Sequence, residues 1–251
     1  MFRADLLKGR KILVTGGGTG LGKSIARRYL QLGAELVVCG RRVDVLDAAV
    51  GELANETGGR IEAIQCDVRQ ADQVESMMSR IWERGPLDVL VNNAAANFIA
   101  RTEKLSPRAI DAVLNIVLHG SFYCTVACGN RWIEAKRAGT VLSVATTPSF
   151  TGSAFTAPSA AAKAGIVGLT KAAAKETARY GIRVNAIQPG LIRTAMTEAM
   201  PDDAWQQKMA DIPMGRAGEP DEVAKVALFY ASDLSSYMTG TVAEVTGGRL
   251  M

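Results

Sequence analysis

A glycine-rich stretch near the N-terminus lies between an apolar segment and a helical pattern. Residues 11–21 read KILVTGGGTGL, and the apolar run Ile12–Val14 predicts a short buried strand. Residues 24–32 have helical spacing and end at Gly33. A strand, a glycine turn and a helix together point free backbone N–H groups and a positive helix end at a phosphate. Glycine suits such a turn because side chains would block the close approach of a pyrophosphate.

The spacing of this stretch is Thr15-Gly16-x-x-x-Gly20-x-Gly22, which differs from the usual G-x-G-x-x-G pattern. A lone glycine loop is also compatible with a tight turn that binds nothing, but later segments agree with a nucleotide. Asp67-Val68 follows the third predicted strand and is placed to contact the edge of an adenine. Asn92-Asn93-Ala94-Ala95 follows the fourth, where small residues let a cofactor backbone pass. We therefore predict a dinucleotide site.

The end of the second predicted strand indicates which nucleotide binds. A carboxylate there would hydrogen-bond the ribose 2′-OH of NAD, but this strand ends Cys39-Gly40-Arg41-Arg42. No acid repels a 2′-phosphate, and two guanidinium groups are available to pair with it. The sequence therefore predicts NADP(H), with the alternative that one or both arginines simply point into solvent.

Composition sets further limits on the function. Among 251 residues, 48% are hydrophobic and 22% charged, which is ordinary for a globular protein with a sizeable core. The net charge of +4 fits phosphate-bearing small molecules, and no long Lys/Arg run suggests nucleic acid. We expect no membrane partner, no signal peptide and a cytoplasmic location. The cysteines have no zinc spacing, so we predict buried free thiols and no metal; they are Cys39, Cys66, Cys124 and Cys128.

Apolar strand-like runs alternate with helical patterns along the whole chain, which predicts a single-domain, doubly wound parallel α/β sheet of about seven strands over residues 1–251. A long helix is expected from Ser106 and Pro107 to about Arg137, with Ser106 as its cap. One long irregular segment, residues 190–218, is expected to be a lid at the carboxyl ends of the strands. The other strands and helices are expected at residues 35–40, 43–57, 61–66, 71–84, 87–92, 140–145, 158–180, 182–187, 219–231 and 242–246.

Three motifs in order resemble the short-chain dehydrogenase/reductase family over essentially the full length. They are the glycine motif, Asn92-Asn93-Ala94, and Pro189-Gly190-x-x-x-Thr194. The resemblance implies a Rossmann fold, a nicotinamide-dependent oxidoreductase and a homotetramer, with Thr194 at the nicotinamide carboxamide. The cofactor-binding residues predicted from the motifs and their neighbours are Thr15, Gly16, Gly18, Thr19, Gly20, Leu21, Gly22, Arg41, Arg42, Asp67, Val68, Asn93, Ala94, Ala95, Lys163, Pro189, Gly190, Ile192 and Thr194.

The catalytic motif departs from the family pattern of Tyr-x-x-x-Lys with a serine thirteen residues earlier. The lysine is Lys163, but Ser159 stands at the tyrosine position, Thr146 at the serine position and Val117 at the helix asparagine position. A phenol near pKa 10, lowered by an ammonium, can protonate a ketone oxygen near neutral pH, whereas a serine hydroxyl is a poor acid. Ordinary carbonyl reduction is therefore disfavoured.

In the middle third, residues 92–99 (NNAAANFI), 102–107 (TEKLSP), 151–155 (TGSAF) and 158–165 (PSAAAKAG) are similar to 2,4-dienoyl-CoA reductases, which are NADPH enzymes of unsaturated fatty-acid degradation. The similarity implies that Asn97 binds substrate, that Ser159 and Lys163 act in catalysis, and that the position of a substrate-holding tyrosine is taken by Pro148. Hydride addition to a conjugated thioester needs donors that stabilise an enolate-like oxygen, which these side chains offer. The last third, from Ile212 onward, is similar to 3-oxoacyl-ACP reductases.

Plainer structural roles compete with the catalytic ones. Ser159 could cap a helix, Asn97 could turn a loop, and Thr146 could end a strand. We predict an NADPH-dependent reductase of an enoyl- or 2,4-dienoyl-CoA (or ACP) thioester. The alternatives are a 3-oxoacyl-thioester reductase or alcohol dehydrogenase, and a catalytically silent NADP-binding protein. A hydrolase would need the sole histidine, His119, and a G-x-S-x-G elbow that the sequence lacks.

Overall fold

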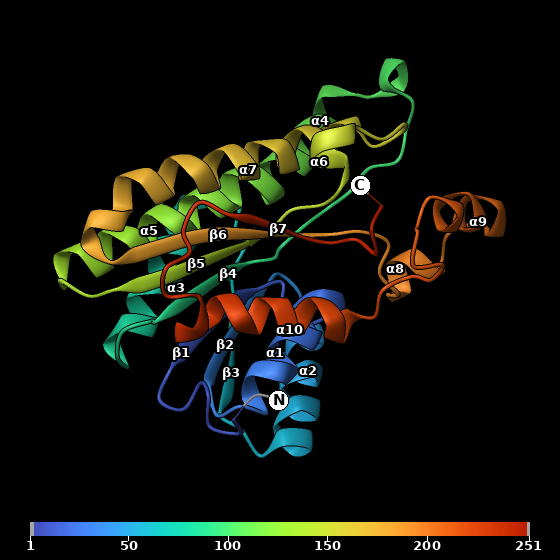
Figure 1. The fold of residues 1–251 in the computed structure, drawn as a ribbon. Coiled ribbons are helices and arrows are strands. Elements are labelled where there is room, and N and C mark those ends of the chain that lie inside the picture. The colour runs from blue at the N-terminus through green and yellow to red at the C-terminus, as the bar shows by residue number, and fades with distance from the viewer. Residues whose placement is uncertain (1–2, 250–251) are drawn as a thin grey trace.

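A twisted parallel sheet runs through the middle of the molecule in the computed structural model, which describes residues 3–249 (Figure 1). All neighbouring strands pair in parallel, in the order β3-β2-β1-β4-β5-β6-β7. The predicted doubly wound α/β fold is therefore confirmed. The strands are β1 (Lys11–Thr15), β2 (Glu35–Gly40), β3 (Ile61–Gln65), β4 (Val89–Asn92), β5 (Gly139–Val144), β6 (Ile182–Pro189) and β7 (Val242–Val245).

Helices cover both faces of the sheet (Figure 1). One core cluster joins the sheet to α1 (Gly20–Leu30), α2 (Val43–Thr57) and α10 (Pro220–Ala231). A second joins the other face to α3 (Ala71–Glu83), α5 (Gly120–Glu134) and α7 (Ala157–Thr177). Both faces are buried, so the central strands are continuous apolar runs instead of alternating ones.

The remaining elements are short. They are η1 (Thr102–Lys104), α4 (Pro107–Leu114), η2 (Asn115–His119), α6 (Pro148–Thr151), η3 (Ala178–Tyr180), α8 (Ala195–Glu198), α9 (Asp202–Ala210) and η4 (Asp233–Ser235). Segment 190–218, expected as an irregular piece, contains α8 and α9. These two helices project beyond the sheet in Figure 1, and Trp205 and Met209 pack there on a small cluster of Leu191, Ile212 and Ala217.

The long helix expected from residue 107 to 137 is present as one helical run from Pro107 to Glu134, with a π-turn inside it. Ser106 caps it as predicted, since its side chain accepts a hydrogen bond from the Ala109 N–H at 3.2 Å. A π-turn, η2, then interrupts the helical pattern before α5 begins at Gly120. Gly120 has no side chain because a Cβ there would lie 2.7 Å from Val68 Cγ2. Such turns are frequent at functional sites, and this one carries Ile116, which reaches the cavity described below.

The same helical stretch has the length and the hydropathy of a helix that could cross a membrane. Within residues 3–249, only Pro107–Glu134 is long and apolar enough for this, with a mean hydropathy of 1.4 over its most apolar window. Half of that window, 50%, is buried inside the fold. The buried residues include Cys124, Cys128 and Trp132, which pack in the core against α3. All four cysteines are buried free thiols, as predicted.

Candidate functional site

A cavity of about 520 Å³ opens at the carboxyl ends of the strands. Its walls come from the turns after β1 to β6, which is the edge where doubly wound sheets bind ligands. Every predicted site residue except Thr15 and Gly22 lines it. Those that do are Gly16, Gly18, Thr19, Gly20, Leu21, Arg41, Arg42, Asp67, Val68, Asn93, Ala94, Ala95, Asn97, Thr146, Ser159, Lys163, Pro189, Gly190, Ile192 and Thr194.

Thr15 lies behind the cavity wall and holds the glycine turn in place. Its buried hydroxyl accepts hydrogen bonds from the N–H groups of Asn93 at 3.0 Å and Ala94 at 2.9 Å. The Asn93 amide donates in return to the carbonyls of Thr15 at 2.9 Å and Gly16 at 3.2 Å. These four bonds fasten the turn after β1 to the turn after β4, so Thr15 and Asn93 shape the cavity through the backbone.

The glycines of the motif serve different purposes. Gly20 has a φ of +53°, a left-handed conformation that disfavours a side chain. Gly22 is needed for close packing, since a Cβ would lie 2.4 Å from both Asn93 Nδ2 and Gly16 O. The first helix begins at Gly20, not at Ser24 as its periodicity suggested, because the glycines make up its first turn. The N-terminal end of α1 therefore opens directly into the cavity, where it favours an anion.

The far end of the cavity carries the predicted 2′-phosphate residues. Arg41 and Arg42 are both exposed and line it beside the apolar side chains of Val45 and Leu46. Arg41 also borders a second, polar cavity of about 580 Å³ against α3. The Asp67 carboxylate is held by Arg69 through contacts of 2.9 Å, and this hydrogen bonding lowers the pKa of Asp67. Positive charge therefore dominates this end of the cavity.

The opposite end holds Lys163, Ser159 and Thr146. Lys163, on α7, is only 6% exposed, and its ammonium donates to the Val144 carbonyl. Burial lowers the pKa of Lys163 to about 8. Ser159 lies one turn earlier on the same helix and on the same face. Within residues 3–249 the hydroxyls of Ser159 and Thr146 have no protein hydrogen-bond partner, so both remain available to a ligand.

The structure tests the purely structural roles that the sequence offered for Ser159 and Asn97. Ser159 does not cap α7, because Thr156 occupies the N-cap position. Asn97 does turn its loop, since its Oδ1 accepts from the Phe98 N–H at 2.9 Å, and its Nδ2 remains free to donate to a ligand. Ser149 donates its hydroxyl to the Thr146 carbonyl at 2.7 Å, and neither it nor Thr147 lines the cavity.

Thr194 is fixed by a residue that the sequence did not single out. Thr197 donates its hydroxyl to the Ile192 carbonyl at 2.6 Å and accepts from the Thr194 N–H at 2.9 Å, forming a reciprocal cap at the start of α8. Thr194 is a residue type preferred at a helix N-cap, but Thr197 stands where a capping box usually has Glu or Gln, so the reciprocal bond is visible only in the fold. Other lining residues that sequence reasoning missed are Cys39, Gly40, Val45, Leu46, Cys66, Ala96, Ile116, Val144, Ala145 and Ala195, which are mostly apolar strand or helix ends.

The donor set fits a phosphate-bearing dinucleotide. A Cβ at Gly16 would lie 3.1 Å from Ala94 Cα, so the close approach of the turns after β1 and β4 favours bare backbone at this position. The cavity combines this bare backbone and a helix N-terminus with Lys163 at one end and two arginines at the other. Lys163 makes no ion pair within residues 3–249. This arrangement suits an elongated anion with ribose hydroxyls near Lys163.

Comparison with known proteins agrees with this geometry. The family model for enoyl-(acyl carrier protein) reductases matches residues 16–249. The chain is 47% identical over 249 residues to an uncharacterized oxidoreductase of Mycobacterium bovis, covering 99% of this chain and 100% of the relative. It is 38% identical to a protein of Bacillus subtilis named a probable 2,4-dienoyl-CoA reductase, with 96% of both chains covered.

Two further proteins are similar to this chain over nearly its full length. A 3-oxoacyl-[acyl-carrier-protein] reductase of Thermotoga maritima is 37% identical, covering 98% of this chain and 99% of that one. A solved structure of a candidate NAD(P)-dependent gluconate 5-dehydrogenase from Beutenbergia cavernae, with bound NADP at low occupancy, has a TM-score of 0.93 and 34% identity over 99% of both chains. The chain belongs to the short-chain dehydrogenase/reductase family and is an NAD(P)-dependent oxidoreductase.

Proposed function

We propose that this protein is an NADPH-dependent reductase of an enoyl- or 2,4-dienoyl thioester. The observation that carries the proposal is the composition of the reacting end of the cavity. It offers two hydroxyls, an amide and one buried ammonium, from Ser159, Thr146, Asn97 and Lys163. Among the described lining residues there is no tyrosine, histidine or glutamate that could serve as a strong positioned acid.

The chemistry of the two candidate substrates differs at the oxygen. A ketone must receive a proton on oxygen as hydride reaches its carbon, which requires an acid in direct contact. A conjugated thioester accepts hydride at an alkene carbon and pushes negative charge onto the thioester oxygen, where hydrogen bonds suffice to stabilise it. The Ser159 hydroxyl and the Asn97 amide can donate such bonds. Proton delivery to carbon then follows as a separate step.

Each residue has a role in this scheme. When bound, the nicotinamide supplies the hydride. Ser159 and Asn97 hold the thioester oxygen, and Thr146 is a further donor beside them. Lys163 holds the ribose hydroxyls. Among the described residues that line this end of the cavity it is the one ionisable group, so it is the reservoir of the proton that the substrate finally receives. Desolvation of its ammonium favours release of that proton near neutral pH.

A preference for NADPH rests on Arg41 and Arg42. Both lie at the end of the cavity away from Lys163, and the nearby Asp67 carboxylate is already paired with Arg69. No uncompensated acid in the described cavity wall would repel a 2′-phosphate. Guanidinium groups bind phosphate through charge-assisted hydrogen bonds that a 2′-hydroxyl cannot match. We expect NADPH to bind more tightly than NADH.

Reduction of a 3-oxoacyl thioester is the second candidate. It is favoured by the Thermotoga maritima relative, and by the lowered pKa of Lys163, which makes its ammonium a stronger acid than an exposed lysine. A silent NADP-binding protein is the third. We further propose one reductase domain with residues 190–218 as a substrate lid, a cytoplasmic homotetramer, and no nucleic-acid or membrane partner.

The test is NADPH consumption with two substrates measured side by side, a trans-2,trans-4-dienoyl-CoA and a 3-oxoacyl-CoA of equal length. The proposal expects turnover of the dienoyl compound, lost in Ser159→Ala and Lys163→Ala. Lys171→Ala is the matched control, because Lys171 is an exposed lysine on the same helix. Turnover of the 3-oxo compound alone contradicts the proposal. NADPH binding without turnover of either compound favours the silent protein.

A further inference from the structure

Large apolar side chains stand exposed on the segments that follow β4, β5 and β6, and these same segments supply residues that line the cavity. Phe98 is 47% exposed and Ile99 76%, both in the loop after β4, and Phe150 and Phe155, from the segment after β5, are 58% and 50% exposed. Met196 of α8, after β6, is 73% exposed and lines the cavity itself. We refer to these five residues as the apolar rim. Exposed apolar side chains gathered on one part of a surface commonly mark a binding site.

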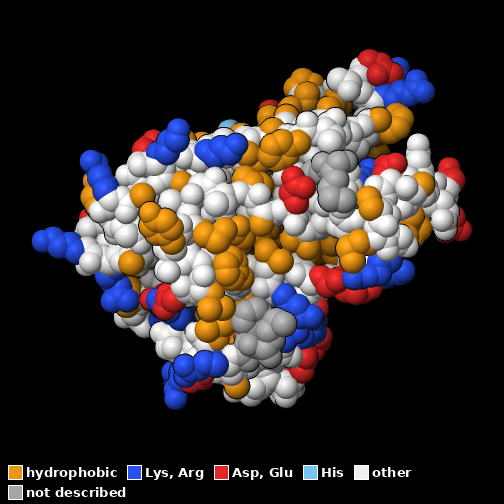
Figure 2. Space-filling model, viewed as in Figure 1, with side chains coloured by type: hydrophobic (Ala, Val, Ile, Leu, Met, Phe, Trp, Pro, Cys, Tyr) orange, Lys and Arg blue, Asp and Glu red, His pale blue; other side chains and the backbone are white. Residues whose placement is uncertain are grey.

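The rim is continuous with the reaction cavity. Phe98 directly follows Asn97, and Phe155 lies one turn before Ser159 along the chain. The Ala100 N–H donates to the Phe155 carbonyl at 3.0 Å, which joins the loop after β4 to the loop before α7. In Figure 1 these loops and α8 lie toward the same end of the sheet, and Figure 2 shows hydrophobic side chains scattered over this part of the surface.

Phe155 is held in a strained conformation. Its φ is +66°, in the left-handed region, and within residues 3–249 only Lys136 shares this among non-glycine residues. A bulky aromatic residue there costs free energy that a glycine would not. The sequence nevertheless keeps a large ring at this position and leaves half of it exposed. Strain retained beside a reaction cavity indicates that the ring serves a ligand.

We propose that the apolar rim is the binding surface for the alkyl chain of an acyl thioester, and that Phe155 is a specificity-determining residue that selects substrates with longer chains. The inference rests on the proposed function, which supplies the thioester group to which this alkyl chain is attached. The occupant is a hydrocarbon chain because the rim side chains carry no charge or hydroxyl, and because Phe98 adjoins Asn97 and Phe155 precedes Ser159 by four residues in the chain. Asn97 and Ser159 would hold the thioester oxygen.

The experiment measures binding and turnover as a function of chain length. Saturated hexanoyl-, decanoyl- and tetradecanoyl-CoA are titrated by calorimetry, and the 2,4-dienoyl-CoA series of the same lengths is assayed for kcat/KM. Each methylene that reaches the rim is expected to improve affinity by about two- to fourfold. Because saturated compounds do not react, chain-length dependence in binding tests the rim even when the proposed reaction fails.

Two substitutions at one position separate the ring from the backbone strain. Phe155→Ala removes the ring and keeps the strained residue, whereas Phe155→Gly removes both and should leave the protein as stable as, or more stable than, the parent. Both variants are expected to lose most of the chain-length dependence. The control is Leu234→Ala, since Leu234 is 55% exposed and lies in η4, away from the cavity lining.

Chain-length dependence that is absent in the parent, or unchanged in both Phe155 variants, overturns the inference. A change in oligomeric state in these variants, with chain-length dependence intact, would assign the rim to contacts between protein molecules instead and also overturns it. Chain-length-dependent binding of saturated compounds, lost in both variants but accompanied by no dienoyl turnover, supports the rim and contradicts only the proposed reaction.

Discussion

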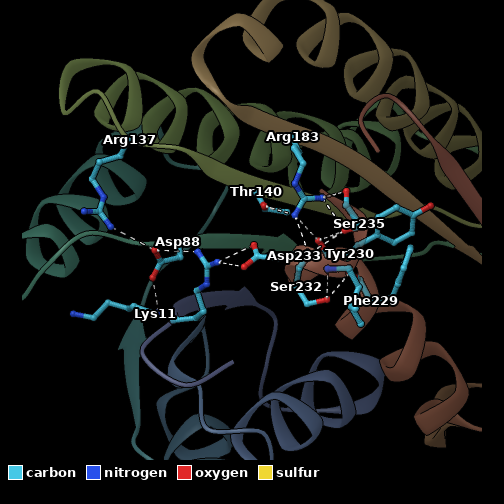
Figure 3. Close-up of polar contacts among 12 residues, drawn as sticks. Lys11, Asp88, Arg137, Thr140, Arg183, Phe229, Tyr230, Ser232, Asp233 and Ser235 are labelled. Atoms are coloured by element: carbon cyan, nitrogen blue, oxygen red, sulfur yellow. Dashed lines mark hydrogen bonds and ion pairs between the residues drawn. The ribbon is translucent and has the colours of Figure 1, made fainter. Parts of the chain in front are cut away.

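The two ends of the sheet differ in how completely their polar side chains are hydrogen-bonded. At the amino ends of the strands, Figure 3 shows Asp88 facing Lys11 and Arg137, and Arg183 surrounded by acceptors. The Asp88 carboxylate accepts from the Lys11 N–H at 2.8 Å and lies 3.5 Å from Arg137. The Arg183 guanidinium donates to Thr140 Oγ1 at 3.0 Å and to Ser235 Oγ at 2.8 Å.

At the carboxyl ends, Thr15 and Asn93 are paired, but several other polar groups remain without partners. Lys163 has a single carbonyl acceptor, and the hydroxyl of Ser159 makes no hydrogen bond within the described chain. Gln188, fully buried in β6, leaves both atoms of its amide unpaired. Unpaired buried polar groups destabilise a fold, so a structure retains them chiefly where they bind something. One end of the sheet therefore stabilises the fold, and the other is kept for chemistry at some cost in stability.

The largest effect is expected at Lys163. Lys163→Met removes the ammonium and should lower kcat by about 10³-fold, in the range of lost acid–base catalysis. Its pKa is lowered from 10.5 to about 8. Between these values the unfolded chain binds the proton and the folded protein does not, so the free energy of unfolding rises with pH across this window.

Below pH 8 the cost of the buried charge is present in full, about 3 kcal/mol. Allowing about 1 kcal/mol for the lost hydrogen bond to Val144, the variant should be more stable at pH 7 by about 2 kcal/mol. This gain should disappear above pH 10. Urea denaturation at both pH values measures the difference. A variant that is less stable than the parent at pH 7 would contradict the view that Lys163 is kept for function.

The opposite outcome is expected at Asp88. Asp88→Ala leaves the Lys11 N–H and the arginines around it without their acceptor, and should lower the free energy of unfolding by about 2–3 kcal/mol. Activity of the folded protein should stay within about twofold. Asp88→Asn retains an acceptor for Lys11 and should cost less. Denaturant unfolding and kcat are measured on the same preparations. A fall in kcat without a loss of stability would show that this end of the sheet has a functional role.

A smaller effect is expected at the arginine pair. Changing Arg41 and Arg42 together to serine removes the charge opposite the 2′-phosphate and should raise KM for NADPH about tenfold, with KM for NADH nearly unchanged. The exposed positions of both residues limit the size of the effect. Arg60→Ser is the control, since Arg60 is an exposed arginine of the same region outside the cavity wall. Equal changes for both cofactors would rule out 2′-phosphate recognition.

The smallest effect is expected at Gln188. Gln188→Met replaces an unpaired amide by an apolar side chain of similar length, and should raise the free energy of unfolding by about 1 kcal/mol. Thermal unfolding would measure this as a modest rise in Tm. A clear loss of stability would instead show that the amide has partners in solution, such as buried water, and would weaken the contrast between the two ends.

Much of the fold followed from local pattern. The strands, the Ser106 cap and the breaks at glycine were predictable because burial and capping leave signals within a few residues. The π-turn at Asn115–His119 and the early start of α1 were missed, because they depend on contacts between distant segments, such as Gly120 against Val68 and Gly22 against Asn93.

The site was predictable where its residues occupy family motif positions. All of the predicted lining residues except Thr15 and Gly22 reach the cavity, whereas these two support it from behind. Thr197 and Phe155 were not predicted, because a reciprocal cap and a strained backbone angle become visible only once the chain is folded.

The most direct test of the central claim is a competition between a 2,4-dienoyl-CoA and a 3-oxoacyl-CoA in one reaction with NADPH deuterated at the transferred position. Mass spectrometry then shows which product carries the deuterium. A cavity with a buried ammonium, free hydroxyls and no phenol predicts deuterium on the carbon of the reduced double bond, with the 3-oxo compound unlabelled. Deuterium at the hydroxyl-bearing carbon of a 3-hydroxyacyl product would contradict the account.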